Sequence, residues 1–186
     1  MILATNNVGK LNEIRKILDE YEIFSLKDKN INIDVVEDQD TFVDNAKKKA
    51  IEVYNLTHEE VIADDSGLCI NVLEGFPGVM THRFLGDDAT DDDRNKFLVD
   101  KLNDYEDRSA FVLCNLVYYD GVDFVVGEGR LDGFISREVR GLNGFGFDSI
   151  FELSSGKTLA ELSGDEKNNV SARYLAAQDL KNKLKK

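Results

Sequence analysis

Apolar residues recur three or four positions apart, the spacing of a helix, in three segments of the chain. These segments are residues 11–21, the stretch after Thr41, and the C-terminal residues 170–184. Thr41, Thr90 and Ser163 are each followed three residues later by an acidic residue, the capping-box pattern of a helix N-terminus. The sequence therefore predicts helices in all three segments and a further helix that Thr90 opens.

Short apolar runs with alternating or β-branched residues predict the strands. They cover residues 1–4, 31–36, 61–63, 68–73, 110–119 and 122–126. Asp120-Gly121 is a strong hairpin signal, so the last two runs are expected to form an antiparallel pair. Ser66-Gly67 is expected to form a turn. Because no linker or repeat divides these elements, we expect one α/β domain over residues 1–186.

The amino-acid composition limits the classes of partner that the protein can bind. Acidic residues outnumber basic ones 36 to 23, and the formal net charge is −13, which repels nucleic acid and anionic membrane surfaces. No run approaches the roughly 18 apolar residues of a membrane span. Cys69 and Cys114 lie in apolar runs and are expected to be reduced core thiols. We therefore expect a cytoplasmic protein with no nucleic-acid partner and no membrane partner.

Two adjacent carboxylates, Asp64 and Asp65, follow the apolar run 61–63. Carboxylates at a strand end suit a divalent cation and an activated water, because hard cations take oxygen ligands and lower the pKa of bound water. Glu37 follows the run 31–36 and can join Asp65 around one cation if the two strand ends are neighbours. A solvated Asp-Asp-Ser-Gly turn is the alternative.

Two segments carry candidate anion-binding residues. Thr5 to Lys10 is a polar stretch before a predicted helix, whose N-terminal N–H groups favour a phosphate. It lacks the ending of a Walker A loop, and an Asn-rich capping turn explains it equally well. Lys49 falls on the apolar face of the helix after Thr41, so its ammonium is expected to point inward.

The stretch Gly144 to Asp148 places two aromatic rings and a carboxylate on a glycine-rich backbone. Phe145 or Phe147 can stack on a planar base while Asp148 accepts a hydrogen bond from its ring N–H. A bulged strand with core phenylalanines is the alternative. Lys167 and Arg173, near the start of the C-terminal helix, can serve one anion.

Together these stretches resemble the inosine triphosphate pyrophosphatase family, which hydrolyses ITP, dITP and XTP to the monophosphate and pyrophosphate. The matching segments occur in family order: Thr5-Asn6-Asn7-Val8-Gly9-Lys10, residues 41–46, Ala63-Asp64-Asp65-Ser66-Gly67-Leu68, Gly78-Val79 with Arg83-Phe84, residues 144–151, residues 156–163 running on to Lys167-Asn168, and Ser171-Ala172-Arg173. The resemblance implies an elongated mixed-sheet α/β fold of two lobes with a nucleotide cleft between them, usually a homodimer.

The resemblance also implies roles for single residues. It makes Asp65 catalytic and has Asp65 and Glu37 hold Mg²⁺. The implied substrate-binding residues are Thr5, Asn6, Asn7, Lys10, Lys49 and Ser66 toward the phosphates, and Phe145, Gly146, Phe147, Asp148, Lys167 and Arg173 toward the base. Three positions depart from the family pattern, with Phe147 for a common Tyr, Ser149 for a common Pro and Ala172 for a common His. Alternatives are a nucleotide-binding protein without catalysis and a pyrophosphatase of modified pyrimidine nucleotides.

Overall fold

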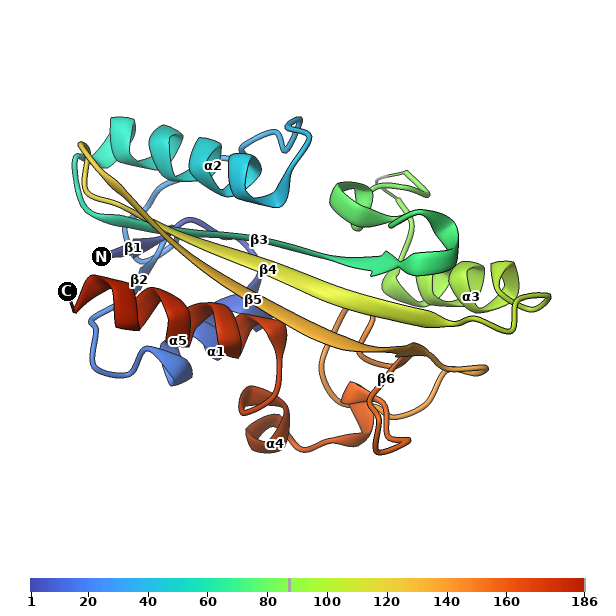
Figure 1. Cartoon of the computed structure of the whole chain (residues 1–186). Helices are drawn as coiled ribbons and strands as arrows, with labels where there is room; N and C mark the ends of the chain where they lie inside the picture. The colour runs from blue at the N-terminus through green and yellow to red at the C-terminus, as the bar shows by residue number, and fades with distance from the viewer. Residues whose placement is uncertain (87, 186) are drawn as a thin grey trace. The chain divides into compact units, whose positions relative to one another are not determined.

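The computed structural model describes residues 1–86 and 88–185. Its helices and strands are β1 (Ile2–Leu3), α1 (Val8–Ile17), β2 (Phe24–Ser25), α2 (Phe42–Thr57), β3 (Val61–Ile70), α3 (Asp91–Lys101), β4 (Ser109–Tyr119), β5 (Phe124–Ile135), β6 (Phe151–Glu152), α4 (Gly164–Asn168) and α5 (Ala172–Leu184) (Figure 1). Short 3₁₀ turns lie at Asn71–Leu73, Gly78–Met80 and Leu159–Glu161. Within the described residues, no helix is long and apolar enough to cross a membrane.

The strands form one six-stranded sheet in the order β2-β1-β3-β4-β5-β6. β1 pairs in parallel with both β2 and β3, whereas β5 and β6 are antiparallel. The predicted mixed-sheet α/β class is therefore confirmed. β4 and β5 are neighbours joined by a tight turn, in which the Asp120 side chain accepts hydrogen bonds from the N–H groups of Val122 and Asp123. This arrangement is the predicted hairpin.

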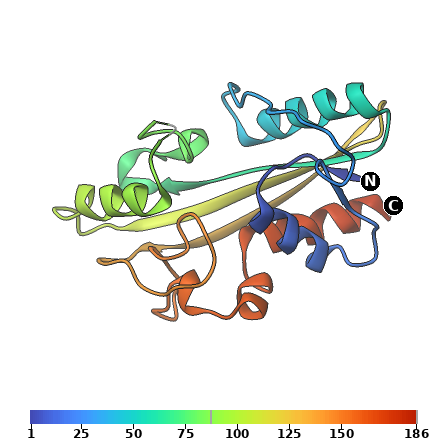
Figure 2. The ribbon, with the colours of Figure 1, turned by 180° about the vertical axis from the view of Figure 1, so that it is seen from behind.

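The contacts divide the chain into two compact units. Unit 1 contains residues 1–66, 114–129 and 172–186, and unit 2 contains residues 67–113 and 130–171. In unit 1, α2 covers one face of the strands while α1 and α5 lie side by side on the other (Figures 1 and 2). Ala46 and Ala50 of α2 pack against Ala63 of β3 in its core, and these small side chains let the helix approach the sheet closely.

Two glycines of β5 lie directly beneath α5 in unit 1. A Cβ at Gly127 would lie 2.3 Å from the Ala176 carbonyl oxygen, and a Cβ at Gly129 would lie 2.1 Å from the Ala172 carbonyl oxygen. Since both distances are far below van der Waals contact, only glycine fits at either position. The sequence predicts a strand that ends at residue 126, but β5 continues to Ile135 because these glycines serve the helix packing.

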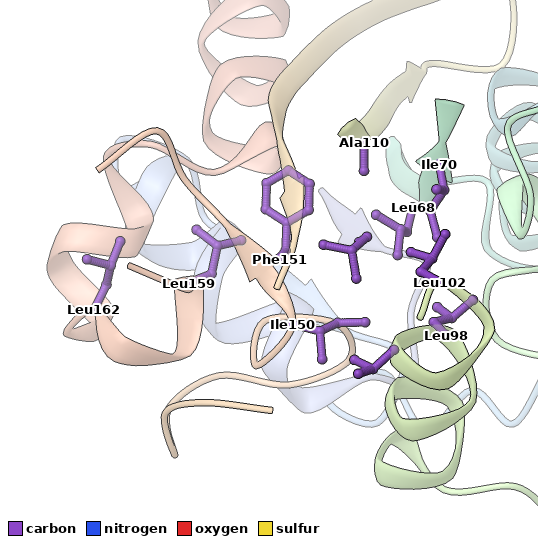
Figure 3. Packing of buried hydrophobic residues seen from close by; sticks show 11 residues of the cluster. Leu68, Ile70, Leu98, Leu102, Ala110, Ile150, Phe151, Leu159 and Leu162 are labelled. Carbon is purple, nitrogen blue, oxygen red and sulfur yellow. The ribbon is translucent and has the colours of Figure 1, made fainter. Parts of the chain in front are cut away.

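In the core of unit 2, the apolar face of α3 packs against the strands of that unit (Figure 3). Leu98 of α3 and Leu102, its C-cap residue, pack with Leu68 and Ile70 of β3, and Phe151 of β6 is fully buried in the same cluster. Thr90 caps α3 with the reciprocal hydrogen bonds to Asp93 that the sequence predicts. This packing fixes the orientation of the first turn of α3.

Several predicted elements are wrong in extent or kind. Residues 31–36 form no strand, although Ile31 and Ile33 pack against the core of unit 1, so their alternation reflects burial without sheet pairing. The first helix begins at Val8 and ends at Ile17, so the predicted polar stretch already contains its first turn. The C-terminal region forms two helices, because α4 ends at Asn168 and α5 starts at Ala172. The strand β2 was not predicted.

The segment around Asp64 and Asp65, the acidic centre, differs most from the sequence prediction. β3 runs unbroken from Val61 to Ile70, so Ser66-Gly67 forms no turn and Asp64 and Asp65 lie within the strand. The predicted strand over residues 68–73 is the end of β3 followed by a 3₁₀ turn. The two carboxylates are therefore held by extended backbone in a fully buried stretch, where side chains must find polar partners.

Candidate functional site

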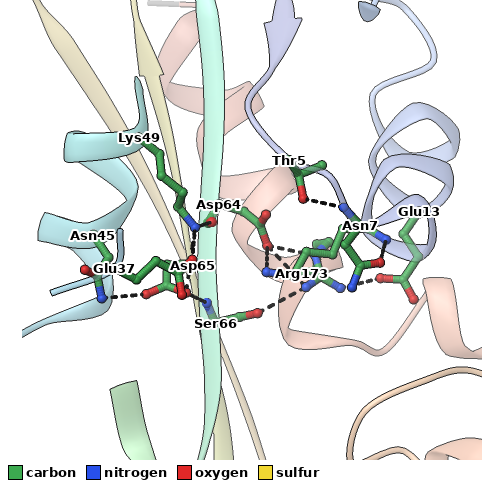
Figure 4. Close-up of polar contacts among 11 residues, drawn as sticks. Thr5, Asn7, Glu13, Glu37, Asn45, Lys49, Asp64, Asp65, Ser66 and Arg173 are labelled. Atoms are coloured by element: carbon green, nitrogen blue, oxygen red, sulfur yellow. Dashed lines mark hydrogen bonds and ion pairs between the residues drawn. The ribbon is translucent and has the colours of Figure 1, made fainter. Parts of the chain in front are cut away.

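Asp64 and Asp65 point to opposite faces of β3, as consecutive residues of a strand do. Figure 4 shows the strand between the two groups of partners, with Asn45, Glu37 and Lys49 on the side of Asp65. The partners of Asp64 lie on the other side. The expectation that adjacent carboxylates act as one pair is therefore wrong, and each has its own environment.

Asp65 is 3% exposed and lies against α2. Its Oδ2 accepts a hydrogen bond of 3.0 Å from Nδ2 of Asn45, and its Oδ1 accepts one of 2.9 Å from the N–H of Ser66. Asn45 begins the second turn of α2, which Thr41 caps. The Thr41 cap fixes where α2 begins, and it therefore fixes the position along the helix at which Asn45 contacts the Asp65 carboxylate.

Lys49 lies one turn further along α2 and is buried, as predicted. Its Nζ donates to Oε1 of Glu37 at 2.6 Å and to the backbone carbonyl of Asp64, and it lies 3.9 Å from Oδ1 of Asp65. The carboxylates of Glu37 and Asp65 thus approach the same ammonium group. The sequence left open whether these two acids are neighbours, and the structure brings both to Lys49, although no strand precedes Glu37.

Burial raises the pKa of Asp65 to about 6, and the negative charge of Glu37 adds to the rise while Lys49 opposes it. Burial by itself would lower the pKa of Lys49, but the carboxylates of Asp64, Asp65 and Glu37 raise it. Lys49 therefore stays charged. Asp65 has the affinity for a proton that a general base at neutral pH requires.

On the opposite face, Asp64 has no exposed surface. Its Oδ2 lies 3.1 Å from Nζ of Lys10 in α1 and 3.2 Å from the guanidinium of Arg173 in α5. Burial would raise the pKa of Asp64, but Lys10 and Arg173 outweigh it and hold the pKa well below its usual value. Oδ1 of Asp64 has no hydrogen-bond partner among the described residues. Asp64 is thus a permanently charged anchor for two cations.

Arg173 also bonds the carboxylate of Glu13 and, at 3.1 Å, the hydroxyl of Ser66. It therefore ties α5 to both α1 and β3. The resemblance groups Arg173 with the base-binding residues, whereas its hydrogen bonds to Asp64, Ser66 and Glu13 lie within unit 1. Glu13 was missed, although it lies one helical turn after Lys10 on the same face of α1.

The polar residues before α1 form its cap. Asn7 is the N-cap, and its side chain accepts a hydrogen bond from the N–H of Lys10 at 3.1 Å. The hydroxyl of Thr5 accepts from the N–H of Asn7, and the side chain of Asn6 donates to the carbonyl of Ile33. A capped helix N-terminus with a lysine in its first turn remains suited to an anion.

The glycine-rich stretch belongs to unit 2 and is a turn, so the alternative of a core strand is wrong. Oδ2 of Asp148 accepts from the N–H of Phe145 at 2.8 Å and from Nζ of Lys167 at 2.5 Å. The same Nζ lies 4.4 Å from the centre of the Phe145 ring. Phe147 packs against the core of unit 2. Phe145, Asp148 and Lys167, which the resemblance assigns to the base, therefore form one cluster.

Gly144 is required by this cluster, because a Cβ there would lie 2.0 Å from Oδ2 of Asp148. A separate cavity of about 460 Å³ in unit 2 is lined by residues such as Arg108, Ile135 and Arg140. None of the predicted site residues lines it. The donors of Arg108 bind backbone carbonyls, which gives that part of the cavity wall a structural role.

A sequence profile of the Ham1 family matches residues 1–183. The dITP/XTP pyrophosphatase of Clostridium tetani is 38% identical over 192 residues, which cover 100% of this chain and 96% of the relative. The dITP/XTP pyrophosphatase of Clostridium perfringens is 40% identical over 196 residues, with 99% and 96% covered. The solved structure of a HAM1 protein from Coxiella burnetii has a TM-score of 0.90 at 36% identity, covering 99% of this chain and 97% of that chain.

These similarities extend over nearly the whole length of each relative, so they concern the complete arrangement of elements described above. They confirm the resemblance that the ordered sequence motifs indicated. The chain belongs to the Ham1 family.

Proposed function

We propose that the chain hydrolyses non-standard purine nucleoside triphosphates, ITP, dITP and XTP, to the nucleoside monophosphate and pyrophosphate. The printed names of its relatives, dITP/XTP pyrophosphatase, support this activity. The observation that carries it is the position of Asp65, a buried carboxylate beside Lys49 with a pKa of about 6. Such a group is ionised at neutral pH yet readily accepts a proton.

In the reaction, Asp65 orients a water molecule and accepts its proton as the water oxygen attacks the α-phosphorus. The bond from that phosphorus to the bridging oxygen of the β-phosphate breaks, and pyrophosphate leaves. Lys49 and Lys10 neutralise the charge that develops on the leaving group. Asp64 holds the ammonium of Lys10 in place from the opposite face of β3.

The residues around Asp65 fit Mg²⁺. Glu37 and Asp65 supply hard oxygen ligands that already approach one cationic group, the Lys49 ammonium. Across residues 1–86 and 88–185, no three acidic, His or Cys side chains group as metal ligands. Two carboxylates suffice, because Mg²⁺ takes its other ligands from water and substrate phosphates. When bound, the ion supplies Lewis-acid polarisation and lowers the pKa of water.

The capped N-terminus of α1 is proposed to bind the phosphates through its N–H groups, with Thr5, Asn6 and Asn7 beside it. Phe145 is proposed to stack on the purine, and Asp148 to accept from the ring N–H that 6-oxo purines carry and adenine lacks. Lys167 supports that carboxylate through its ion pair. Arg173 and Ser66 complete the set of substrate-binding residues.

A screen of nucleoside triphosphates with and without Mg²⁺, scored separately for pyrophosphate and orthophosphate, tests this proposal. Release of pyrophosphate from ITP and XTP with Mg²⁺, and little from ATP, is the expected result. Binding without hydrolysis indicates a nucleotide-binding protein, and a preference for modified pyrimidine nucleotides indicates the related pyrophosphatase class. Release of orthophosphate contradicts attack at the α-phosphorus.

We propose that the protein acts as a homodimer in the cytoplasm. Exposed apolar side chains such as Val122 and Leu142 offer surface for a second copy, although the net charge of −13 per chain opposes association. The free, buried thiols of Cys69 and Cys114 suit a reducing compartment. Sedimentation at low and high salt tests the dimer, and a monomer at both contradicts it.

A further inference from the structure

The first two turns of α3 hold both backbone polar groups of Gly146 within unit 2. Oδ2 of Asp91 accepts a hydrogen bond of 2.8 Å from the N–H of Gly146, and Nδ2 of Asn95 donates one of 2.9 Å to the Gly146 carbonyl. Asp91 and Asn95 are four residues apart and therefore lie on the same helix face. One face of α3 thus clamps Gly146 from both sides of its Cα.

The clamp acts on a glycine-rich turn. Gly146 has a φ of +62° and Gly144 a φ of +80°, and a Cβ at Gly146 would meet nothing within 4 Å. Glycine in an open turn has many accessible conformations, so the local sequence alone does not fix this segment. Phe145 lies between the two glycines and Asp148 follows two residues later. Their positions therefore depend on how Gly146 is held.

Asn95 is an unfavourable choice for stability alone. It is 1% exposed, and its Oδ1 has no hydrogen-bond partner among the described residues. A buried unpaired acceptor is destabilising, and an apolar residue of the same size avoids that penalty. Its second Nδ2 hydrogen is directed to the same segment, to Oγ of Ser149 at 3.0 Å. Both donors of Asn95 therefore hold the turn that carries Phe145 and Asp148.

Asp91 is itself fixed by a neighbour. The guanidinium of Arg94 donates to Oδ1 of Asp91 at 3.1 Å and to the backbone carbonyl of His82. Arg94 is buried, whereas the side chain of Asp91 is partly exposed. The carboxylate of Asp91 therefore bridges Arg94 and the glycine turn.

We propose that Asn95 and Asp91 are positioning residues that determine base selectivity by fixing the 144–149 turn. They touch no substrate and act through the backbone N–H and C=O groups of Gly146. Recognition of a distinctive polar group depends on exact placement of its partner, because a misplaced partner no longer forms the hydrogen bond that favours the correct base. The proposal rests on the proposed function, since it assigns this turn to the base of the nucleotide.

The main test is Asn95→Leu, which removes both donors and also the unpaired acceptor while keeping the volume. We expect the ratio of kcat/KM for ITP to kcat/KM for ATP to fall about tenfold. This fall should come from a lower kcat/KM for ITP, while kcat/KM for ATP stays within about twofold of wild type. Tm should stay within a few degrees of wild type. Amide hydrogen exchange across residues 144–149 should accelerate, and this readout needs no substrate.

A second pair of variants keeps the test valid if Asn95→Leu fails to fold. Asp91→Ala should lower the ITP over ATP ratio, and Asp91→Asn, which retains an acceptor for the Gly146 N–H, should restore most of it. Asp92→Ala is the matched control, because Asp92 is an exposed acid in the same turn of α3.

Three outcomes are informative. Loss of selectivity together with faster exchange supports the proposal. Equal losses for ITP and ATP, or an unchanged exchange rate across the turn, overturn it and leave Asn95 a structural residue. If the wild-type protein releases no pyrophosphate from ITP, the proposed function has failed, and the exchange rates still decide whether Asn95 holds the turn.

Discussion

Replacing Asp65 by asparagine should make the protein more stable and inactive at once. The pKa of this carboxyl is raised from 3.8 to about 6, so in the metal-free protein its ionised form is disfavoured by folding. A difference of roughly two pH units between folded and unfolded states corresponds to about 3 kcal/mol. Asparagine never ionises and removes this destabilisation. It also lacks the charge that binds a cation and accepts a proton, so turnover should disappear.

The weakening of the local hydrogen bonds offsets part of this gain in stability. The carboxylate accepts hydrogen bonds from Asn45 and Ser66 on different oxygens, and asparagine retains one acceptor oxygen, which costs about 1 kcal/mol. The net increase is about 2 kcal/mol, which raises Tm by roughly 4–8 °C for a chain of this size. The stabilisation that protonated Asp65 gives the wild type is complete below pH 3.8 and is lost as pH rises through 6. The advantage of the variant should therefore be absent near pH 4 and complete above pH 7.

Asp64→Asn is the matched comparison, because it makes the same chemical change one residue earlier in β3. The pKa of Asp64 is held below its usual value, so its stabilisation is present above pH 3.8 and lost as pH falls through the lowered pKa. Removing its charge leaves buried Lys10 without this anion and leaves buried Arg173 with Glu13 alone, which should cost about 3–5 kcal/mol at neutral pH. Neighbouring substitutions should thus shift stability in opposite directions.

The assay is thermal unfolding of wild type and both variants from pH 4 to pH 8 in EDTA without nucleotide. A gain for Asp65→Asn of equal size at both ends of the range would refute the electrostatic argument, since a packing effect has no such pH dependence. Wild-type pyrophosphate release by Asp65→Asn would remove its catalytic assignment. Similar shifts for both variants would contradict the separate environments on the two faces of β3.

Four further substitutions test other residues of the site and the packing of α5. Lys10→Ala and Lys49→Ala should each weaken triphosphate binding far more than monophosphate binding, as measured by calorimetry, because the lost attraction grows with the charge on the β- and γ-phosphates; equal losses would contradict contact with the phosphate tail. Ala172→His should raise the kcat/KM ratio of ITP over ATP severalfold by adding a hydrogen-bond donor for the 6-oxo group, and an unchanged ratio would show that position 172 does not read the base. Gly129→Ala should lower Tm by several degrees, because its Cβ would overlap the Ala172 carbonyl; an unchanged Tm would show that α5 can shift away at little cost.

Local chemistry made much of the fold predictable. The caps at Thr41, Thr90 and Ser163 and the hairpin at Asp120-Gly121 depend on residues close in sequence, and the structure contains all of them. The inward direction of Lys49 followed from helix periodicity. The α/β class followed from the same patterns, and the mixed sheet was implied by the family resemblance.

The acidic centre was misread because its structure depends on distant partners. Asp-Asp-Ser-Gly favours a turn by local propensity, yet Asp64 is held in a strand by Arg173, 109 residues away. No periodicity reveals that pairing. Asn95 was missed for the same reason, since its partner Gly146 is 51 residues further along the chain. The roles of these residues became visible only through their three-dimensional contacts.

The alternation of side chains along β3 makes the length of this strand as important as its composition. Deleting one residue among Val61, Ile62 and Ala63 would keep every charged side chain of the site in the sequence. Asp65 would then point toward the α1 side, and Ser66 would occupy the place beside α2. Within this stretch, natural variation should therefore proceed by substitution, with insertions and deletions confined to loops. A homologue with all the right residues and one missing position here would be an inactive protein that sequence identity alone fails to reveal.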